Sequence, residues 1–169
     1  MNISEFEDAY EDQQRIRGAI VATLISELPL RDPILVHAAE NVVAAVNAMN
    51  EHRTGCVLVE HGGKLVGIFT ERDVLTRVVF RSNNRSMTLE SVMTKDPETL
   101  EATETIAFAL NKMSVGGYRH LPIVDRDGKP VGVLSVRDIV DFLVALFPDD
   151  VLNLPPSPAK GIGKSLDGG

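Results

Sequence analysis

The chain has 169 residues, a formal net charge of −7 and a pI near 5.1, and 44% of its residues are hydrophobic. This length suffices for one domain with a sizeable core, or for two small repeats that share one. The acidic balance argues against non-specific binding to nucleic acid or to an anionic membrane. The single cysteine, Cys56, excludes an internal disulfide framework and favours a reducing cytoplasm. No apolar run reaches the roughly 20 residues of a transmembrane helix.

The first predicted element is a helix over residues 4–28. Four apolar residues recur every fourth position and give one stripe: Ile16, Ile20, Leu24 and Leu28. The stripe can pack on the rest of the chain or on a second subunit, and the residues alone leave both partners open. We take residues 1–23 as an N-terminal helix outside the repeats that follow.

Residues 24–80 form the first repeat. Asp32-Pro33 begins an extended segment, because proline disfavours helix for the residue before it. His61-Gly62-Gly63 is a hairpin turn signal between two β-rich runs. The predicted elements are a strand at 34–36, a helix at 39–52, strands at 56–59 and 65–69, and a helix that starts at Thr70.

Residues 88–147 repeat this pattern after a polar linker at 81–87, and a Pro- and Gly-rich tail at 148–169 is predicted to be extended. Asp96-Pro97 answers Asp32-Pro33 at an offset of 64 residues (96 − 32). Past the helix we read the offset as 65, so that Val124 answers Val59. On this reading Thr54, Gly55 and Cys56 take the places of Arg119, His120 and Leu121.

Each repeat ends in Gly-apolar-apolar-Thr/Ser-x-Arg-Asp, first at Gly67–Asp73 and again at Gly132–Asp138. Together with Ser91–Thr94, Tyr118–Asp125 and Gly128–Gly132, the ordered set resembles the cystathionine β-synthase (CBS) domain, two of which in tandem form a Bateman module. The resemblance covers about residues 24–147. It implies an α+β fold in which two β-α-β-β-α units pack about a pseudo-twofold axis, with the N-terminal helix and the tail as additions. It also implies a homodimer, and adenosine ligands in clefts between the units.

Ser135 and Asp138 stand at the start of a predicted helix, as do Thr70 and Asp73. The unpaired N–H groups there attract phosphate, and a carboxylate suits the two hydroxyls of a ribose. The same pair of residues is also a near capping box, which stabilises a helix by about 1 kcal/mol without any ligand. The local chemistry leaves both roles open. The resemblance implies that the hydroxyl lies near phosphate or ribose and that the Asp holds the ribose.

Further candidates surround these pairs. Arg119 and His120 can donate to phosphate or form a solvated pair beside a turn, and Tyr118 can flank a base or cover the core. The remaining ligand-binding candidates are Gly132, which lets backbone approach closely, with Ile34, Pro97, Pro122 and Arg137. Because Arg119 and His120 accompany it, the second copy is predicted to be the better site.

We therefore expect a stand-alone regulatory module and not an enzyme. It would bind AMP, ADP, ATP or S-adenosylmethionine and alter association with an unidentified effector protein or with its own copy. The alternative is a structural dimerisation module with no physiological ligand. An enzyme acting on a nucleotide is a third hypothesis, for which the sequence offers no recognisable base or nucleophile. We expect no required cofactor and no metal site, because the four histidines lack helical i,i+4 spacing and Cys pairs are absent.

Overall fold

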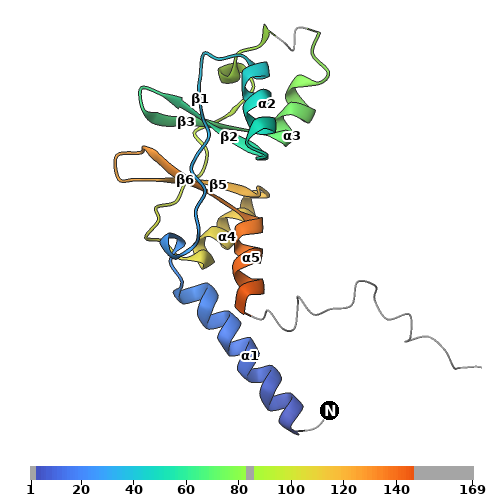
Figure 1. The fold of residues 1–169 in the computed structure, drawn as a ribbon, viewed down its shortest axis with the longest axis vertical. Helices are drawn as coiled ribbons and strands as arrows, with labels where there is room; N and C mark the ends of the chain where they lie inside the picture. The colour runs from blue at the N-terminus through green and yellow to red at the C-terminus, as the bar shows by residue number, and fades with distance from the viewer. Residues whose placement is uncertain (1–2, 83–85, 147–169) are drawn as a thin grey trace, which may run out of the picture.

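The two repeats lie one above the other, and the N-terminal helix projects from the lower one (Figure 1). The structure, a computed structural model, describes residues 3–82 and 86–146. The predicted tail at 148–169 lies outside the described residues. None of the described helices is long and apolar enough to cross a membrane. The sheets of the two repeats face each other in the middle of the molecule, and helices cover their outer sides (Figure 1).

The first repeat builds a four-stranded sheet in the order β1-β2-β3-β4. Strands β2 and β3 form the predicted antiparallel hairpin, and Gly62 and Gly63 supply its two positive φ angles of 61° and 77°. The elements are β1 (Leu35–His37), α2 (Val42–Glu51), β2 (Cys56–His61), β3 (Lys64–Thr70), α3 (Glu71–Asp73) and η2, a π-helical turn (Val74–Val78). The strand β4 (Thr94–Lys95) comes from the second repeat and pairs with β3.

The second repeat follows the same plan with a two-stranded sheet. Its elements are η4 (Leu89–Ser91), α4 (Ile106–Gly116), β5 (His120–Val124), β6 (Pro130–Ser135) and α5 (Val136–Leu146). Arg31, which precedes β1, forms an antiparallel bridge with Val133 on β6. Each repeat therefore lends a short extended segment to the sheet of the other.

Three apolar clusters hold these elements together. One fills the first repeat and includes Phe69 and Leu89, and a second fills the second repeat around Leu121 and Leu134. A third lies between the two sheets and consists of Cys56, Leu58 and Ile68, with Leu65 and Val133 packed against it. The contact between the repeats is thus apolar at its centre. The polar residues lie around this apolar centre.

The predicted N-terminal helix is wrong beyond Ala22. Helix α1 spans Ile3–Ala22, Leu24 is extended, and a short 3₁₀ turn, η1 (Ile25–Glu27), follows. The Ile25 N–H donates to the Glu104 carbonyl at 2.8 Å, and Ile25 is fully buried in the second core. The free energy gained by burying Ile25 and Leu28 against the second repeat exceeds the free energy that a longer, solvated helix would provide.

The predicted position of the inserted residue is also wrong. Gly67 and Gly132 occupy matching places in β3 and β6, yet their partners are Val59 and Ile123, which are 64 residues apart. By this register His120 answers Cys56, and Arg119 answers Gly55. The insertion lies in the β5–β6 hairpin, where the Asp125 carboxylate accepts from the Asp127 and Lys129 N–H groups. A turn takes up an extra residue without breaking strand pairs.

Candidate functional site

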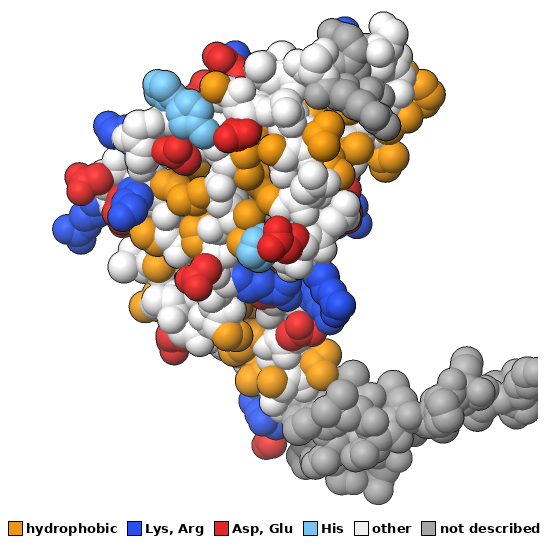
Figure 2. Space-filling view, turned by 45° about the horizontal axis from the view of Figure 1, so that its top comes forward, with side chains coloured by type: hydrophobic (Ala, Val, Ile, Leu, Met, Phe, Trp, Pro, Cys, Tyr) orange, Lys and Arg blue, Asp and Glu red, His pale blue; other side chains and the backbone are white. Residues whose placement is uncertain are grey.

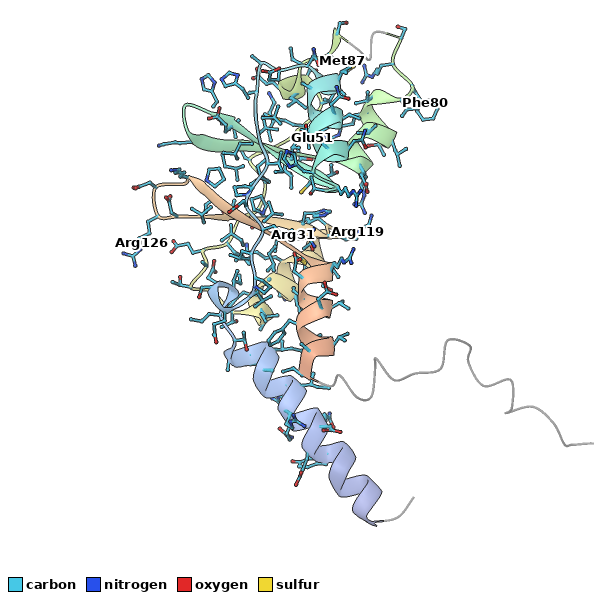
Figure 3. All side chains as sticks on the ribbon, viewed as in Figure 1. Arg31, Glu51, Phe80, Met87, Arg119 and Arg126 are labelled. Atoms are coloured by element: carbon cyan, nitrogen blue, oxygen red, sulfur yellow. The ribbon has the colours of Figure 1, made fainter. Side chains whose placement is uncertain are left out.

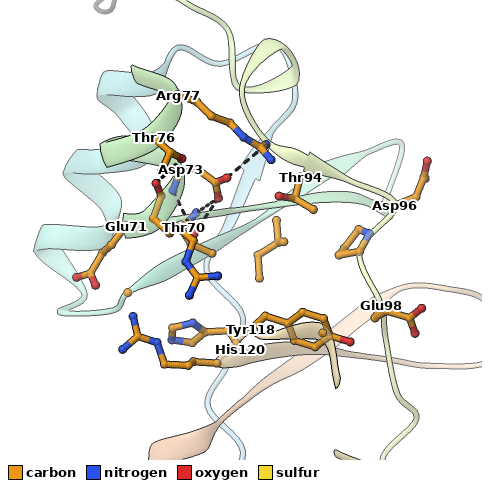
Figure 4. A pocket seen from close by; sticks show the side chains of 16 residues that line it. Thr70, Glu71, Asp73, Thr76, Arg77, Thr94, Asp96, Glu98, Tyr118 and His120 are labelled. Carbon is orange, nitrogen blue, oxygen red and sulfur yellow. Dashed lines mark hydrogen bonds and ion pairs between the residues drawn. The ribbon is translucent and has the colours of Figure 1, made fainter. Parts of the chain in front are cut away.

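The first of two clefts between the repeats contains Asp73, and we call it the Asp73 cleft. Its volume is 440 Å³, within the range of small-molecule sites. Thr70 and Asp73 line one side, from the end of β3 into α3. Tyr118 and His120 of the second repeat line the other side (Figure 4), and Pro97 also lines this cleft.

The second cleft contains Asp138, and we call it the Asp138 cleft. It has a volume of 690 Å³. Ser135, Arg137 and Asp138 line it from the second repeat, and Ile34 and Arg53 line it from the first. The two clefts are related by the repeat, since Thr70 and Ser135 occupy matching ends of β3 and β6.

Both Asp side chains cap the helical turn that they begin. The Thr70 N–H and hydroxyl donate to Asp73 Oδ2 at 2.9 and 2.8 Å. The Ser135 N–H and hydroxyl donate to Asp138 Oδ2 at 2.8 and 2.6 Å. The side chains of Asp73 and Asp138 are 7% and 8% exposed. The predicted capping role is confirmed in both copies, and it occupies only one oxygen of each carboxylate.

The second carboxylate oxygen pairs with an arginine in each cleft. Arg77, four residues along the same helical segment, lies 3.3 Å from Asp73 Oδ1. Arg31, from the extended segment before β1, lies 3.3 Å from Asp138 Oδ1. Each buried carboxylate is thereby charge-compensated, although by arginines of different origin.

His120 is shared by the two clefts, together with Arg119, Glu71 and Gly55. Burial, followed by the nearby Arg119 charge, lowers the pKa of His120 from its ordinary value of 6.5. The imidazole is therefore neutral at pH 7 and offers one donor and one acceptor. Lys and Arg side chains gather beside a histidine and an acidic side chain on one face of the molecule (Figure 2).

Tyr118 lines the Asp73 cleft but not the Asp138 cleft. Burial, with the negative charge of Glu98 as a second cause, raises the pKa of its phenol. The hydroxyl consequently stays protonated at neutral pH and can donate a hydrogen bond. Tyr118 also packs against the second core, so both roles left open by the sequence are compatible with its position.

The structure brings most of the predicted site residues to the clefts. The Asp73 cleft is lined by Thr70, Asp73, Pro97, Tyr118, Arg119 and His120. The Asp138 cleft is lined by Ile34, Arg119, His120, Ser135, Arg137 and Asp138. Because Arg119 and His120 line both, they do not distinguish the second copy as the better site. Tyr118 and Pro97 accompany the first copy.

Two predicted residues line neither cleft. Pro122 is buried in β5, and its carbonyl accepts from the Leu100 N–H at 3.2 Å. A Cβ at Gly132 would meet Leu30 Cβ at 3.5 Å and the Arg31 carbonyl at 3.6 Å. The close approach at Gly132 is therefore made by Leu30 and Arg31 of this chain and not by a ligand.

Sequence reasoning missed Arg31 as a site residue, because the residue belongs to the segment exchanged between sheets. Arg53 lines the Asp138 cleft as well. Arg53 has a φ of 50°, and Gly117, which answers it at an offset of 64, has a φ of 67°. A left-handed arginine costs roughly 1–2 kcal/mol relative to its usual conformations, and such strain often marks a functional position.

Cys56 is buried at the edge of the Asp138 cleft. Burial raises the pKa of its thiol to about 11. The thiol is therefore protonated and weakly reactive, as its apolar strand predicts. Among residues 3–82 and 86–146, no three His, Cys, Asp or Glu side chains are grouped so as to hold a metal ion.

Comparison with known proteins identifies the repeats. The family model described as CBS domain matches residues 25–79 and 89–145. A CBS domain-containing protein of Arabidopsis thaliana, CBSCBSPB3, is 35% identical over 113 residues, which are 66% of this chain and 20% of that protein. The chain thus spans about a fifth of the length of this plant relative.

Two solved structures share the fold. The CBS domain pair of protein MJ0100, in complex with 5′-methylthioadenosine and S-adenosyl-L-methionine, superposes with a TM-score of 0.66 at 26% identity, covering 73% of this chain and 98% of that one. The CBS domain protein PAE2072 of Pyrobaculum aerophilum, complexed with AMP, gives a TM-score of 0.65 at 25% identity, covering 73% and 99%.

Proposed function

Because the chain belongs to the CBS domain family and carries two of its repeats, we propose that it is a regulatory module that binds an adenosine-containing ligand. The candidates are AMP, ADP, ATP and S-adenosylmethionine. One observation carries the proposal: each of two clefts between the repeats contains a buried carboxylate with one oxygen held by a capping hydroxyl and the other facing a cation. Solved relatives hold AMP, 5′-methylthioadenosine and S-adenosylmethionine, which supports this ligand class.

Each part of such a ligand has suitable partners in the Asp73 cleft. Asp73 Oδ1 can accept from the ribose hydroxyls beside its pairing with Arg77, since capping uses Oδ2 alone. Tyr118 and Pro97 offer flat apolar surface for the base. Arg119 and His120 offer donors to a phosphate. In the Asp138 cleft, Ile34 takes the apolar role and Arg137 adds a cation.

Both repeats contribute to each cleft, so a bound ligand favours one arrangement of the repeats over others. We propose that this preference is read by an effector protein or by a second copy of the chain, and that the chain is not itself an enzyme. Apolar residues exposed on η2 and α4, among them Leu75 at 64% and Val115 at 82%, suit contact with a second copy. Buried, reduced Cys56 fits a cytoplasmic protein.

A structural dimerisation module without a ligand is the second candidate. The observation that favours it is the ion pair on each carboxylate, because Asp73 and Asp138 are already satisfied within the chain. On this reading the clefts are by-products of packing and nucleotides have no effect.

Calorimetric titration of the full chain with AMP, ATP and S-adenosylmethionine separates the two candidates. We expect binding of at least one ligand, and loss of binding to the corresponding cleft in Asp73→Asn and Asp138→Asn. Asp125→Asn is the matched control, because Asp125 also accepts backbone N–H bonds but lies in the hairpin outside both clefts. Absence of heat and of any thermal shift with all three ligands would sink the sensing function and leave the structural one.

A further inference from the structure

The two clefts carry different sets of cations, although the repeats that form them are equivalent. In the first sheet the residue opposite Ile68 is Thr94, and in the second sheet the residue opposite Val133 is Arg31. Thr94 lines the Asp73 cleft and Arg31 lines the Asp138 cleft. An arginine therefore stands at the Asp138 cleft where the other cleft has a hydroxyl.

A second cation is added by Arg53. It lines the Asp138 cleft from the left-handed position that the second repeat fills with Gly117. The lining of the Asp138 cleft thus includes four arginines and three acidic residues, namely Arg31, Arg53, Arg119 and Arg137 against Asp32, Glu71 and Asp138. The Asp73 cleft reverses the balance, with three arginines against Glu71, Asp73, Asp96 and Glu98.

The arginines on the two carboxylates also differ in how firmly they are held. The Arg77 guanidinium donates to the carbonyls of Val92 and Met93 at 2.9 and 2.8 Å, in addition to its pairing with Asp73. Within the described part of the chain, the Arg31 guanidinium has Asp138 as its one hydrogen-bonding or ion-pair partner. Its side chain is 56% exposed. Arg31 therefore gives up one ion pair when a ligand takes its place on Asp138, whereas Arg77 would give up three acceptors.

Ligand binding at Asp138 would free Arg31 for a new partner. Ribose hydroxyls that donate to Asp138 Oδ1 would displace the Arg31 guanidinium. The released guanidinium is a planar group of N–H donors that matches a phosphate in geometry and charge. Arg31 and Arg119 both lie between the two repeats (Figure 3), and both line this cleft. Two or three phosphates would then meet several guanidinium groups, in a cleft that is larger by 250 Å³ (690 − 440).

We propose that the Asp138 cleft selects a nucleoside di- or triphosphate, with Arg31 moving from Asp138 to the phosphates, and that the Asp73 cleft selects a nucleoside or its monophosphate. This inference rests on the proposed function and divides its ligands between the clefts. Asp96 at the Asp73 cleft repels added phosphate charge. Arg77 in this cleft is held by two backbone carbonyls in addition to Asp73.

The test is calorimetric titration of the full chain with adenosine, AMP, ADP and ATP. The variants are Arg31→Gln, Arg31→Lys and the matched control Arg126→Gln, whose arginine is exposed in the β5–β6 hairpin and lines neither cleft. Asp73→Asn and Asp138→Asn assign each binding event to a cleft. Melting temperatures establish that the variants are folded.

We expect affinity to rise from AMP to ATP at the Asp138 cleft and to stay level or fall at the Asp73 cleft. Arg31→Gln should weaken ATP about 10-fold or more at the Asp138 cleft, as expected for loss of a charge-assisted hydrogen bond. Arg31→Lys should be intermediate, and Arg126→Gln should leave the ATP affinity of this cleft unchanged. Equal phosphate dependence in the two clefts, or an unchanged ATP to AMP ratio in Arg31→Gln, would overturn the inference while the proposed function stands. No binding of any of the four ligands would overturn the proposed function itself.

Discussion

The imidazole of His120 lies against the backbone of Gly55. A Cβ built on Gly55 would stand 3.3 Å from His120 Cε1 and 3.4 Å from Nε2. Gly55 precedes β2 in the first repeat, and His120 begins β5 in the second, so this contact joins the repeats. Because both residues line both clefts, a change here reaches the two sites together.

Gly55→Ala should therefore weaken ligand binding in both clefts. The added methyl group requires the His120 ring to shift by a few tenths of an ångström. We expect a several-fold loss of affinity at each site and a stability loss of about 1 kcal/mol, measured by titration and by urea denaturation. Gly18→Ala in α1 is the control, because nothing lies within 4 Å of its Cβ position. It should stabilise the helix by about 0.5–1 kcal/mol and leave binding unchanged.

Gly116→Ala should affect one cleft and spare the other. A Cβ at Gly116 would stand 1.9 Å from Tyr118 Cε1, so the ring must move. Tyr118 lines the Asp73 cleft alone. We expect a destabilisation of about 1–3 kcal/mol from overpacking, with weaker binding at the Asp73 cleft. Equal losses at both clefts in a titration would contradict the assignment of Tyr118 to one site.

The stability of the fold should decrease on acidification through the titration of His120. Its folded-state pKa lies below the ordinary 6.5, so below about pH 6.5 the unfolded chain binds more protons than the folded chain. The free energy of unfolding is then lost as the pH falls from 6.5 towards the folded pKa. Urea denaturation between about pH 7.5 and about pH 5 measures this slope. His120→Gln should flatten it, and an unchanged slope in the variant would assign the effect to other groups.

Cys56 should resist thiol reagents in the native state. Its side chain is 3% exposed, and burial raises its pKa to about 11, so little thiolate exists at pH 8. We expect slow labelling by a maleimide at that pH and rapid labelling in urea, followed by mass spectrometry. Protection of Cys56 by nucleotide that is lost in Asp138→Asn and kept in Asp73→Asn would place the ligand in the Asp138 cleft, which Cys56 lines. Rapid native labelling would show that the centre between the sheets opens readily.

The order of elements could be predicted because strand and helix periods are local properties of the chain. The hairpin at Gly62-Gly63 and the caps at Thr70 and Ser135 follow from turn and cap chemistry alone, and the structure confirms them. The break after Ala22 was not predictable in this way, since it depends on hydrogen bonds from Ile25 and Ser26 to carbonyls about 80 residues away.

The same distinction holds for the clefts. Asp73 and Asp138 stand out because their motif is duplicated, whereas Arg31 has no motif and reaches Asp138 through the exchange of strand segments. The one-residue error in aligning Arg119 with Thr54 arose because sequence matching cannot decide whether an insertion lies before a strand or in its hairpin. Backbone pairing decides it, through the partners of Gly67 and Gly132.

The exchange of segments has a consequence for the folding of the chain. A fragment ending at Ser82 lacks Thr94 and Lys95, the outer strand of its own sheet. A fragment starting at Ser86 lacks Ile25 and Leu28, which belong to its own core. We therefore expect neither half of a divided chain to fold alone, and we expect the two halves to become ordered when they are mixed.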